Sequence, residues 1–314
     1  MNKNSIMDKR KSNYIIFAEN FYLDNNKLKA IQFYNKALQF ESSSEDDIQI
    51  LFNIAAIYDE LDKPLKSLET YEKILNMDNT QAGAYYGMAI MEERIGHKEK
   101  ALSYYLKAIE LNENYDRAYY YAANIYDEID NKDKALEFYK KVVEIMPDDY
   151  FAYNNIGSLY EESGEYDKAL VMINKSLKIN PDYYKALFNL GVVNKKLGDN
   201  NKALECYYKS LDNNKDHPNT YLNMSAIYIE EHSYTEAIEI LTMGIKYNPA
   251  AHDLYYNRAC CYSILEEEDK AIRDLRKALL LDPSLIYWIK KDKDFCNLYE
   301  NREFKRIIKE YNFE

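Results

Sequence analysis

The feature that most constrains this chain is a spacing of 34 residues. Alanine recurs inside similar short motifs, such as DKAL, EKAL, NKAL and TEAI, and the interval between successive alanines does not change. The aligned alanines are Ala101, Ala135, Ala169, Ala203, Ala237 and Ala271. Ser67 continues the series one interval earlier, and Ala30 precedes Ser67 by 37 residues. The chain therefore contains eight units, with a three-residue insertion that we expect in the loop 41–47.

Other columns keep the same register. Twelve residues before the aligned alanine stands a small residue: Ala18, Ala55, Ala89, Ala123, Gly157, Gly191, Ser225 and Ala259. Four residues after it stands a large one: Tyr34, Tyr71, Tyr105, Tyr139, Ile173, Tyr207, Leu241 and Leu275. These spacings predict two amphipathic helices per unit, packed closely through the small columns and filled by the large ones. A single pair of helices cannot bury both of its apolar faces, so the pairs must stack.

This pattern resembles the tetratricopeptide repeat family. The resemblance implies an all-α fold, a right-handed α-α superhelix in which each repeat is a helical hairpin. We place repeats at about 11–44, 48–81, 82–115, 116–149, 150–183, 184–217, 218–251 and 252–285. The residues 1–10 then form a short N-terminal segment. The residues 284–314 resemble the closing segment that follows many such arrays, and their apolar residues predict capping helices.

Composition restricts the class of protein. The chain has 314 residues, 47% hydrophobic and 30% charged, with only 8 glycines and 6 prolines, which is typical of an ordered helical protein. The formal net charge of −12 argues against nucleic-acid binding, because phosphate contacts need a basic surface. We expect no signal peptide and no membrane span, since no apolar run is long enough. We therefore expect a cytoplasmic protein, and high Asn, Lys, Ile and Tyr usage suggests a bacterial one.

No combination of residues predicts catalysis, and we expect neither an enzyme nor a cofactor. Nucleotide-binding, zinc-protease and nucleophile-elbow motifs are absent from the sequence. The four cysteines, Cys206, Cys260, Cys261 and Cys296, lack the spacing of a metal site and are expected to be reduced thiols. The acidic pairs at 46–47 and 292–294 could bind a cation, but a charged loop or helix start is the better interpretation, so we predict no metal site.

The face of each hairpin that stacking does not use is the candidate binding site. We number the positions of each repeat from its first residue. Positions 2, 5, 6, 9, 12 and 13 of the first helix share a stripe, here called the groove stripe. In the tetratricopeptide family this stripe lines a concave groove. At position 6 four consecutive repeats carry asparagine, and a fifth occurs earlier: Asn155, Asn189, Asn223, Asn257 and Asn53.

Asparagine is a mediocre helix former, so its repetition inside a helix needs a reason. A primary amide can bond a peptide backbone whatever the side chains are, so this column could grip an extended chain. It resembles the asparagine ladder in the repeats of O-GlcNAc transferase, whose catalytic part has no counterpart here. The alternative is that each asparagine bonds only the neighbouring repeat.

Rings and charges complete the groove stripe. Position 5 is mostly large and apolar, including Tyr86, Tyr120, Phe188 and Tyr256; these rings could contact a ligand or shield contacts between repeats. Positions 12 and 13 are mainly acidic in repeats two to five, at Asp59, Glu60, Glu93, Asp127, Glu128, Glu161 and Glu162. The sixth repeat instead has Lys195 and Lys196, with Lys185 at position 2. Basic ligand residues would suit the acidic end, and an anion the lysines.

Chaperone-binding members of the family hold a C-terminal carboxylate in a clamp of lysine, asparagine and arginine. Asn124, Asn155 and Lys185 match three of the clamp positions. Tyr120 and Asn189 stand where the outer lysine and the arginine would be. This departure argues against a receptor for chaperone tails.

The sequence thus predicts a non-catalytic scaffold or adaptor that binds an extended peptide segment of a partner protein. Two alternatives stay open. One is a receptor for a small peptide or metabolite that regulates a partner protein, and the other is a scaffold that assembles with itself.

Overall fold

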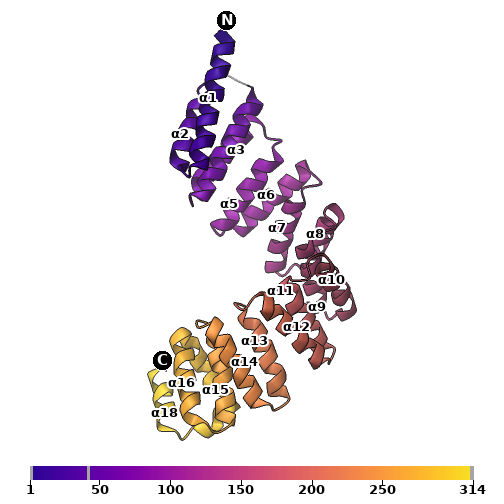
Figure 1. Cartoon of the computed structure of the whole chain (residues 1–314), viewed down its shortest axis with the longest axis vertical. Coiled ribbons are helices and arrows are strands. Elements are labelled where there is room, and N and C mark those ends of the chain that lie inside the picture. Colours follow the sequence, from indigo (N-terminus) through magenta and orange to yellow (C-terminus); the bar gives the residue numbers. More distant parts are fainter. Residues whose placement is uncertain (1–2, 41–42, 312–314) are drawn as a thin grey trace. The chain divides into compact units, whose positions relative to one another are not determined.

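Helices account for all regular structure in the residues that are described. The computed structural model describes residues 3–40 and 43–311, and each regular element in those ranges is a helix (Figure 1). By its internal contacts the chain divides into two compact units, the first ending at Pro147 and the second beginning at Asp148. The all-α prediction is confirmed.

The first unit consists of helices that pack in consecutive pairs. They are α1 (Lys3–Leu23), α2 (Lys27–Ala37), α3 (Ser44–Glu60), α4 (Pro64–Met77), α5 (Ala82–Arg94), α6 (Lys98–Leu111), α7 (Asp116–Glu128) and α8 (Lys132–Ile145). Each pair, such as α5 with α6, forms one hairpin, and the second helix of a hairpin packs on the first helix of the next.

The second unit continues the same pattern and ends in a closing segment. Its hairpin helices are α9 (Tyr150–Glu162), α10 (Tyr166–Ile179), α11 (Tyr184–Lys196), α12 (Asn200–Asn213), α13 (Pro218–Glu230), α14 (Tyr234–Tyr247), α15 (His252–Ile264) and α16 (Glu268–Leu281). The closing segment comprises η1 (Pro283–Leu285), α17 (Ile286–Ile289), η2 (Lys293–Leu298) and α18 (Arg302–Glu310).

One residue with left-handed backbone turns each hairpin, and it always stands at position 15. These residues are Asn25, Asp62, Gly96, Asp130, Gly164, Gly198, His232 and Glu266. Glycine adopts this conformation without cost, and asparagine and aspartate tolerate it. Glu266, with φ of 62°, costs about 1–2 kcal/mol relative to glycine. The turn is therefore fixed by repeat geometry even where the residue is unfavourable.

Close helix packing explains the small and large columns. The aligned alanines, for example Ala135 and Ala203, have no exposed surface. A Cβ atom on Gly157 would lie 2.5 Å from Cγ1 of Ile173 and 3.3 Å from the carbonyl oxygen of Ala169. Because part of that contact is backbone, α9 and α10 can approach this closely only with glycine at position 8.

The predicted site of the insertion is only partly a loop. Residues 44–47 belong to α3, which has 17 residues where α5 has 13. The side chain of Ser43 accepts a hydrogen bond from the backbone nitrogen of Asp46 at 3.2 Å, and Glu45, Asp46 and Asp47 occupy the first turn. This cap and the acidic residues favour a helix start here, so the expectation of a loop was wrong for 44–47. The residues 41–42 lie outside those described.

The closing segment packs on the last hairpin. Ile289, Phe295, Leu298, Phe304 and Ile307 are buried in one cluster with residues of α15 and α16. Ile286 and Ile308 are partly buried against the same cluster. At the other end, α1 is already helical from Lys3, within the segment 1–10. Within the described ranges, the chain contains no helix with the length and apolar character to cross a membrane.

Candidate functional site

Position 6 of the groove stripe faces a fixed neighbour. In the described pairs, it lies against position 24 in the second helix of the preceding repeat. Position 24 is the column of large residues that stands four residues after the aligned alanine. In the first unit, the Asn53 amide nitrogen donates to the Tyr34 hydroxyl at 3.3 Å, and the rings of Tyr105 and Tyr121 stack with centroids 5.9 Å apart. In the second unit, the Asn223 amide nitrogen donates to the Tyr207 hydroxyl at 3.5 Å. The two columns must therefore be considered together.

Where position 24 is aliphatic, the asparagine finds another acceptor. In the repeat before Asn189, position 24 is Ile173. The amide nitrogen of Asn189 instead donates to Oδ1 of Asn154 at 2.9 Å. In the repeat before Asn257, position 24 is Leu241. The amide nitrogen of Asn257 donates to the backbone oxygen of Asp253, one turn earlier in α15, at 2.8 Å. Three of the five predicted asparagines, Asn53, Asn189 and Asn223, thus bond the preceding repeat, as the alternative interpretation requires.

These bonds use the amide nitrogens and leave oxygens available. For Asn189, Asn223 and Asn257, the side-chain oxygen accepts no hydrogen bond from any residue that the structure describes. None of these oxygens is buried without a partner among those residues, so each reaches solvent. Three consecutive repeats of the second unit therefore present a hydrogen-bond acceptor at the same helix position, each fixed by a bond through its nitrogen.

Asn154 and Asn155 have different roles from those suggested by their columns. Asn154 is 3% exposed; its nitrogen donates to Oδ1 of Asn155 at 3.3 Å while its oxygen accepts from Asn189. It is a buried link between α9 and α11, and not merely a polar break in the position-5 stripe. Asn155 is half-buried and its oxygen is already bonded. The sequence did not reveal this link because it joins positions 5 and 6 of different repeats.

The amides of the first unit are more fully used. Asn53 also accepts from Nε2 of Gln49 at 3.4 Å, so both of its polar groups are bonded within the unit. Asn124 accepts from the hydroxyl of Tyr139. These residues lie on the predicted helices, but they offer less to a ligand than the second-unit asparagines.

The predicted rings pack extensively within the chain. Tyr86 lies against Tyr115 with ring centroids 4.9 Å apart, and burial raises the pKa of Tyr86. Tyr120 packs edge-on against Tyr139, at 5.7 Å. Phe188 packs edge-on against His217 at 4.8 Å and tilts against Tyr207. These three predicted rings are themselves half-buried, so they both support the stack and form part of its surface.

Tyr256 is held by the closing segment. Its hydroxyl donates to Oδ2 of Asp292 at 2.5 Å, and its ring meets Phe295 edge-on at 5.8 Å. Burial raises the pKa of Tyr256, and the hydrogen bond to Asp292 raises it further. The hydroxyl of Tyr256 is thus committed to the cap, which favours the shielding interpretation for this ring.

The charged part of the groove stripe is largely paired. Asp59 pairs with Arg94, Glu60 with Lys27, Asp127 with Lys132 and Glu128 with Lys98. Lys195 pairs with Glu230 of the next repeat at 2.8 Å, whereas Lys185 is exposed and its charge contributes to the lowered pKa of His217, after burial of that ring. The simple picture of an acidic end and a basic spot is therefore weakened by local neutralisation.

Two glutamates show how differently the same residue type is held. Glu92 is 2% exposed and contacts Nδ1 of His97 at 2.8 Å and Nζ of Lys100 at 2.5 Å. Burial opposes ionisation of Glu92, but the hydrogen bonds from Lys100 and His97 lower its pKa overall. For Glu161, burial raises the pKa, and the charge of Lys196 offsets this only in part. Glu92 stands nine residues before Ala101, where five other repeats carry tyrosine, and this departure is the only sign of Glu92 in the sequence.

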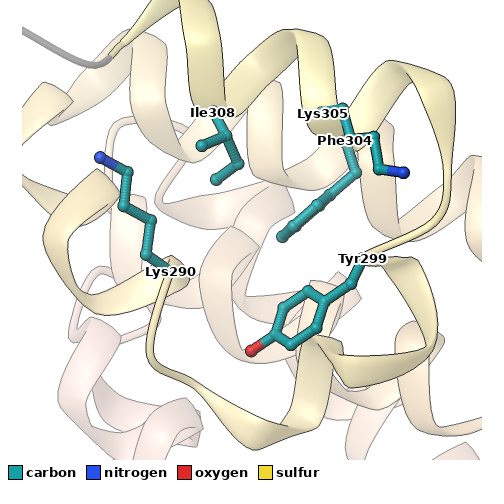
Figure 2. A pocket seen from close by; sticks show the side chains of 5 residues that line it. All are labelled: Lys290, Tyr299, Phe304, Lys305 and Ile308. Carbon is teal, nitrogen blue, oxygen red and sulfur yellow. The ribbon is translucent and has the colours of Figure 1, made fainter.

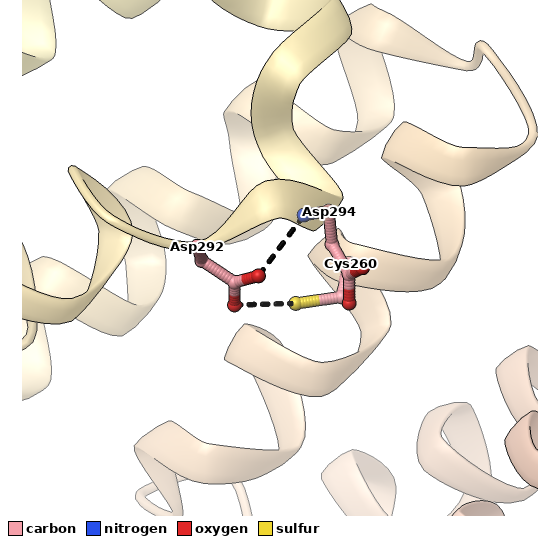
Figure 3. A group of neighbouring side chains, drawn as sticks. All are labelled: Cys260, Asp292 and Asp294. Carbon is pink, nitrogen blue, oxygen red and sulfur yellow. Dashed lines mark hydrogen bonds between the residues drawn. The ribbon is translucent and has the colours of Figure 1, made fainter.

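Cys260, Asp292 and Asp294 form the one group in the described residues with the proximity of metal ligands, all ligand atoms lying within 4.8 Å (Figure 3). The Asp292 carboxylate caps η2 by accepting from the backbone nitrogen of Asp294 at 3.0 Å. It also accepts from Tyr256 and, at 3.8 Å, from the thiol of Cys260. Burial, followed by the nearby aspartates, raises the pKa of Cys260 and keeps it a thiol. This group holds the closing segment on α15, in line with the predicted charged helix start.

Comparison with known proteins identifies the family. The family described as "Tetratricopeptide repeat" matches residues 48–81, 82–115, 116–149, 150–183, 172–205 and 252–285, which together exceed half of the chain. The chain belongs to the tetratricopeptide repeat family. The prediction of the family and of its superhelical solenoid fold is confirmed.

The tetratricopeptide relatives agree on the fold. A crystal structure of a tetratricopeptide repeat protein from Parabacteroides merdae aligns with a TM-score of 0.63 and 16% identity, covering 84% of this chain and 98% of that one. A chain of the APC/C hetero-tetramer Cut9-Hcn1 aligns with a TM-score of 0.59 and 15% identity, covering 96% of this chain and 55% of that one. At such identities the likeness concerns the fold alone.

A curated relative is similar over a shorter stretch. The photosystem I assembly protein Ycf3 of Prochlorococcus marinus is 30% identical over 93 residues, which is 29% of this chain and 54% of that protein. This chain therefore matches about half the length of the relative. Tetratricopeptide repeat proteins are generally non-catalytic, and membership of the family supports a protein-interaction scaffold.

Proposed function

We propose that the protein is a non-catalytic cytoplasmic scaffold that binds an extended peptide segment of a partner protein along the groove stripe of repeats six to eight. The single observation that carries this proposal is the set of three solvent-facing amide oxygens on Asn189, Asn223 and Asn257. An array of acceptors suits the backbone N–H groups of an extended chain, which are present whatever the side chains are.

The direction of the hydrogen bonds sharpens the proposal. Each amide nitrogen is occupied by an acceptor of the same chain, so the side chain cannot rotate freely. Fixing the side chain before the ligand arrives reduces the entropy lost on binding. The available oxygens are suited to donors of the ligand, either backbone N–H groups or side chains such as arginine.

The spacing of the array favours one ligand conformation. Two of the first helices that carry the array, α13 and α15, pack directly on each other. Packed helices lie about 8–10 Å apart. A polyproline II chain repeats every three residues, or about 9.3 Å, whereas one face of a β-strand repeats about every 6.6–6.8 Å. We therefore propose a polyproline II ligand that bonds one asparagine with every third backbone N–H.

The test is a selection of peptides on the full chain from a random-peptide phage library. We expect the selected peptides to bind the triple variant Asn189→Ala/Asn223→Ala/Asn257→Ala at least about tenfold more weakly than wild type, because each lost acceptor leaves a donor unsatisfied. Fluorescence anisotropy with labelled copies of the selected peptides measures the affinities.

The matched control replaces asparagines of the second helices. Asn174 and Asn213 donate to the carbonyl oxygen four residues earlier, as Asn257 does, but lie outside the groove stripe. Asn174→Ala/Asn213→Ala should bind as wild type does. Peptides that bind the triple variant with unchanged affinity, or a selection that yields no binding peptide, would contradict the proposal.

A further inference from the structure

A second surface feature lies in the closing segment, away from the groove stripe. A pocket of about 360 Å³ is lined by Lys290, Tyr299, Phe304, Lys305 and Ile308 (Figure 2). All five residues follow the last repeat. We call this the cap pocket. Its volume is at the lower end of the range for ligand pockets, about 300–1,000 Å³, so it suits one large side chain.

The floor of the cap pocket is apolar and well fixed. Phe304 is 3% exposed and packs against Phe295 and Tyr299, with ring centroids 6.3 Å and 5.9 Å away. The Tyr299 hydroxyl donates to the backbone oxygen of Asp292 at 3.3 Å, which holds this ring beside the pocket. The floor therefore does not have to reorganise when an apolar group enters.

The rim of the cap pocket is basic. Lys290 and Lys305 lie on opposite sides of the Phe304 ring (Figure 2). Lys305 pairs with Glu300 at 2.6 Å, but Glu300 is 93% exposed, and exposed pairs of this kind contribute little stability. A carboxylate from a ligand can replace Glu300 at small cost. This basic rim stands out in a chain whose formal net charge is −12.

Exposed rings precede the pocket in the same segment. Tyr287 and Trp288 of α17 are 56% and 61% exposed, with ring centroids 5.4 Å apart, and Trp288 is the single tryptophan of the chain. Tryptophan and tyrosine are over-represented among the residues that dominate protein interfaces. Their exposure indicates that the closing segment does more than cover the last repeat.

We propose that the cap pocket docks an acidic segment of a partner protein, which inserts one aromatic or large aliphatic side chain over Phe304 and places carboxylates beside Lys290 and Lys305. The concave, apolar pocket suits a segment that can insert one side chain over Phe304, which a flat lipid surface cannot do, and the lysines on its rim suit carboxylates beside that side chain. This docking site is independent of the asparagine array.

The experiment selects peptides from a random-peptide phage library on the triple asparagine variant, so that the groove stripe cannot contribute. The proposal expects an enriched motif in which an aromatic or large aliphatic residue is flanked by aspartate or glutamate. It also expects binding to weaken by about tenfold or more in Lys290→Glu/Lys305→Glu. The matched control is Lys309→Glu/Arg302→Glu, exposed basic residues that do not line the pocket, which should bind as the parent does.

Several results would overturn the proposal. One is the absence of any peptide whose binding depends on Lys290 and Lys305. A second is sedimentation with phosphatidylserine vesicles that is lost in Lys290→Glu/Lys305→Glu, which would assign the surface to lipid. A third is a dimer in analytical ultracentrifugation that the same variant dissociates, which would assign it to a second copy. Since the groove variant and the cap variant differ, failure of one proposal leaves the other testable.

Discussion

The two units solve the same packing problem with different chemistry. In the first unit, position 6 includes Gly87 and Tyr121, which accommodate or stack on the tyrosine rings of the preceding repeats, and Asn53, whose nitrogen and oxygen are both bonded within the unit. In the second unit, the same position holds asparagines, three of which, Asn189, Asn223 and Asn257, bond through the nitrogen and keep an oxygen toward solvent. The difference teaches that the surface at position 6 depends on the residue at position 24 of the preceding repeat as well as on its own residue. A position 6 that is filled by a packed ring cannot also offer a polar group to solvent.

The largest expected effect comes from placing the second-unit residue in the first unit. A Cβ atom on Gly87 would lie 2.2 Å from Cζ of Tyr71, so Gly87→Asn must displace a partly buried ring. We expect the free energy of unfolding to fall by about 1–3 kcal/mol, measured by urea denaturation. In a Tyr71→Leu background, which copies Leu241 at the same position, the cost should become much smaller. An equal cost in both backgrounds would refute the pairing of the two columns.

The next prediction uses the two contrasting glutamates. Glu92→Gln should lower the free energy of unfolding at neutral pH by about 1–2 kcal/mol, because charged hydrogen bonds to Lys100 and His97 are lost. Since the folded pKa of Glu92 is lowered, its contribution is present above the ordinary value of 4.5 and is lost as pH falls through the folded pKa. The gap between wild type and variant should therefore close in acid.

Glu161→Gln should behave in the opposite sense. The folded pKa of Glu161 is raised by burial, so its ionised form costs free energy at neutral pH, and this cost disappears as pH falls through the raised pKa. The variant should be more stable than wild type at neutral pH and equal to it in acid. Urea denaturation from neutral pH down to about pH 3 checks both variants, and the same sign of effect for both would contradict the account.

The buried link of the second unit should have a moderate effect. Asn154→Ala removes the acceptor of Asn189 and the donor to Asn155, so we expect a loss of about 1 kcal/mol, measured by thermal and urea unfolding. The companion variant Asn154→Leu copies Leu222 at the same position and tests whether apolar packing can replace the link. Wild-type stability in Asn154→Ala would show that the amide contributes nothing.

The smallest effect is expected where the hydrogen bond is longest. Tyr207→Phe removes the hydroxyl that Asn223 contacts at 3.5 Å but keeps the buried ring. Stability should change by less than about 0.5 kcal/mol, because the exposed part of the amide can bond water instead. A nuclear magnetic resonance spectrum should show the change confined to the Asn223 side-chain amide. A loss above 1 kcal/mol would mean that this bond is far stronger than its length implies.

The sequence predicted the fold because periodicity determines it. Position 20 is the aligned alanine, position 8 is the other small column, and position 24 is the large column. Each of these columns has one structural role in every repeat, so the columns are enough to predict the helical hairpins. The site was predicted only in part. Each groove residue was assigned from its own column, whereas the partner of Asn189 depends on Ile173 in the preceding repeat and on Asn154 in the helix beside it. Likewise, the hydroxyl of Tyr256 is held by Asp292 of the closing segment, which lies outside the repeat period.

The central claim is that the second unit presents amide oxygens to the backbone of an extended ligand. The most direct measurement is calorimetric titration of the full chain with one library-selected peptide and with copies of it methylated at each backbone nitrogen in turn. Methylation removes one N–H donor at a time. The account predicts losses of about tenfold at nitrogens spaced three residues apart and little change between them. Equal tolerance of methylation at every position would contradict it.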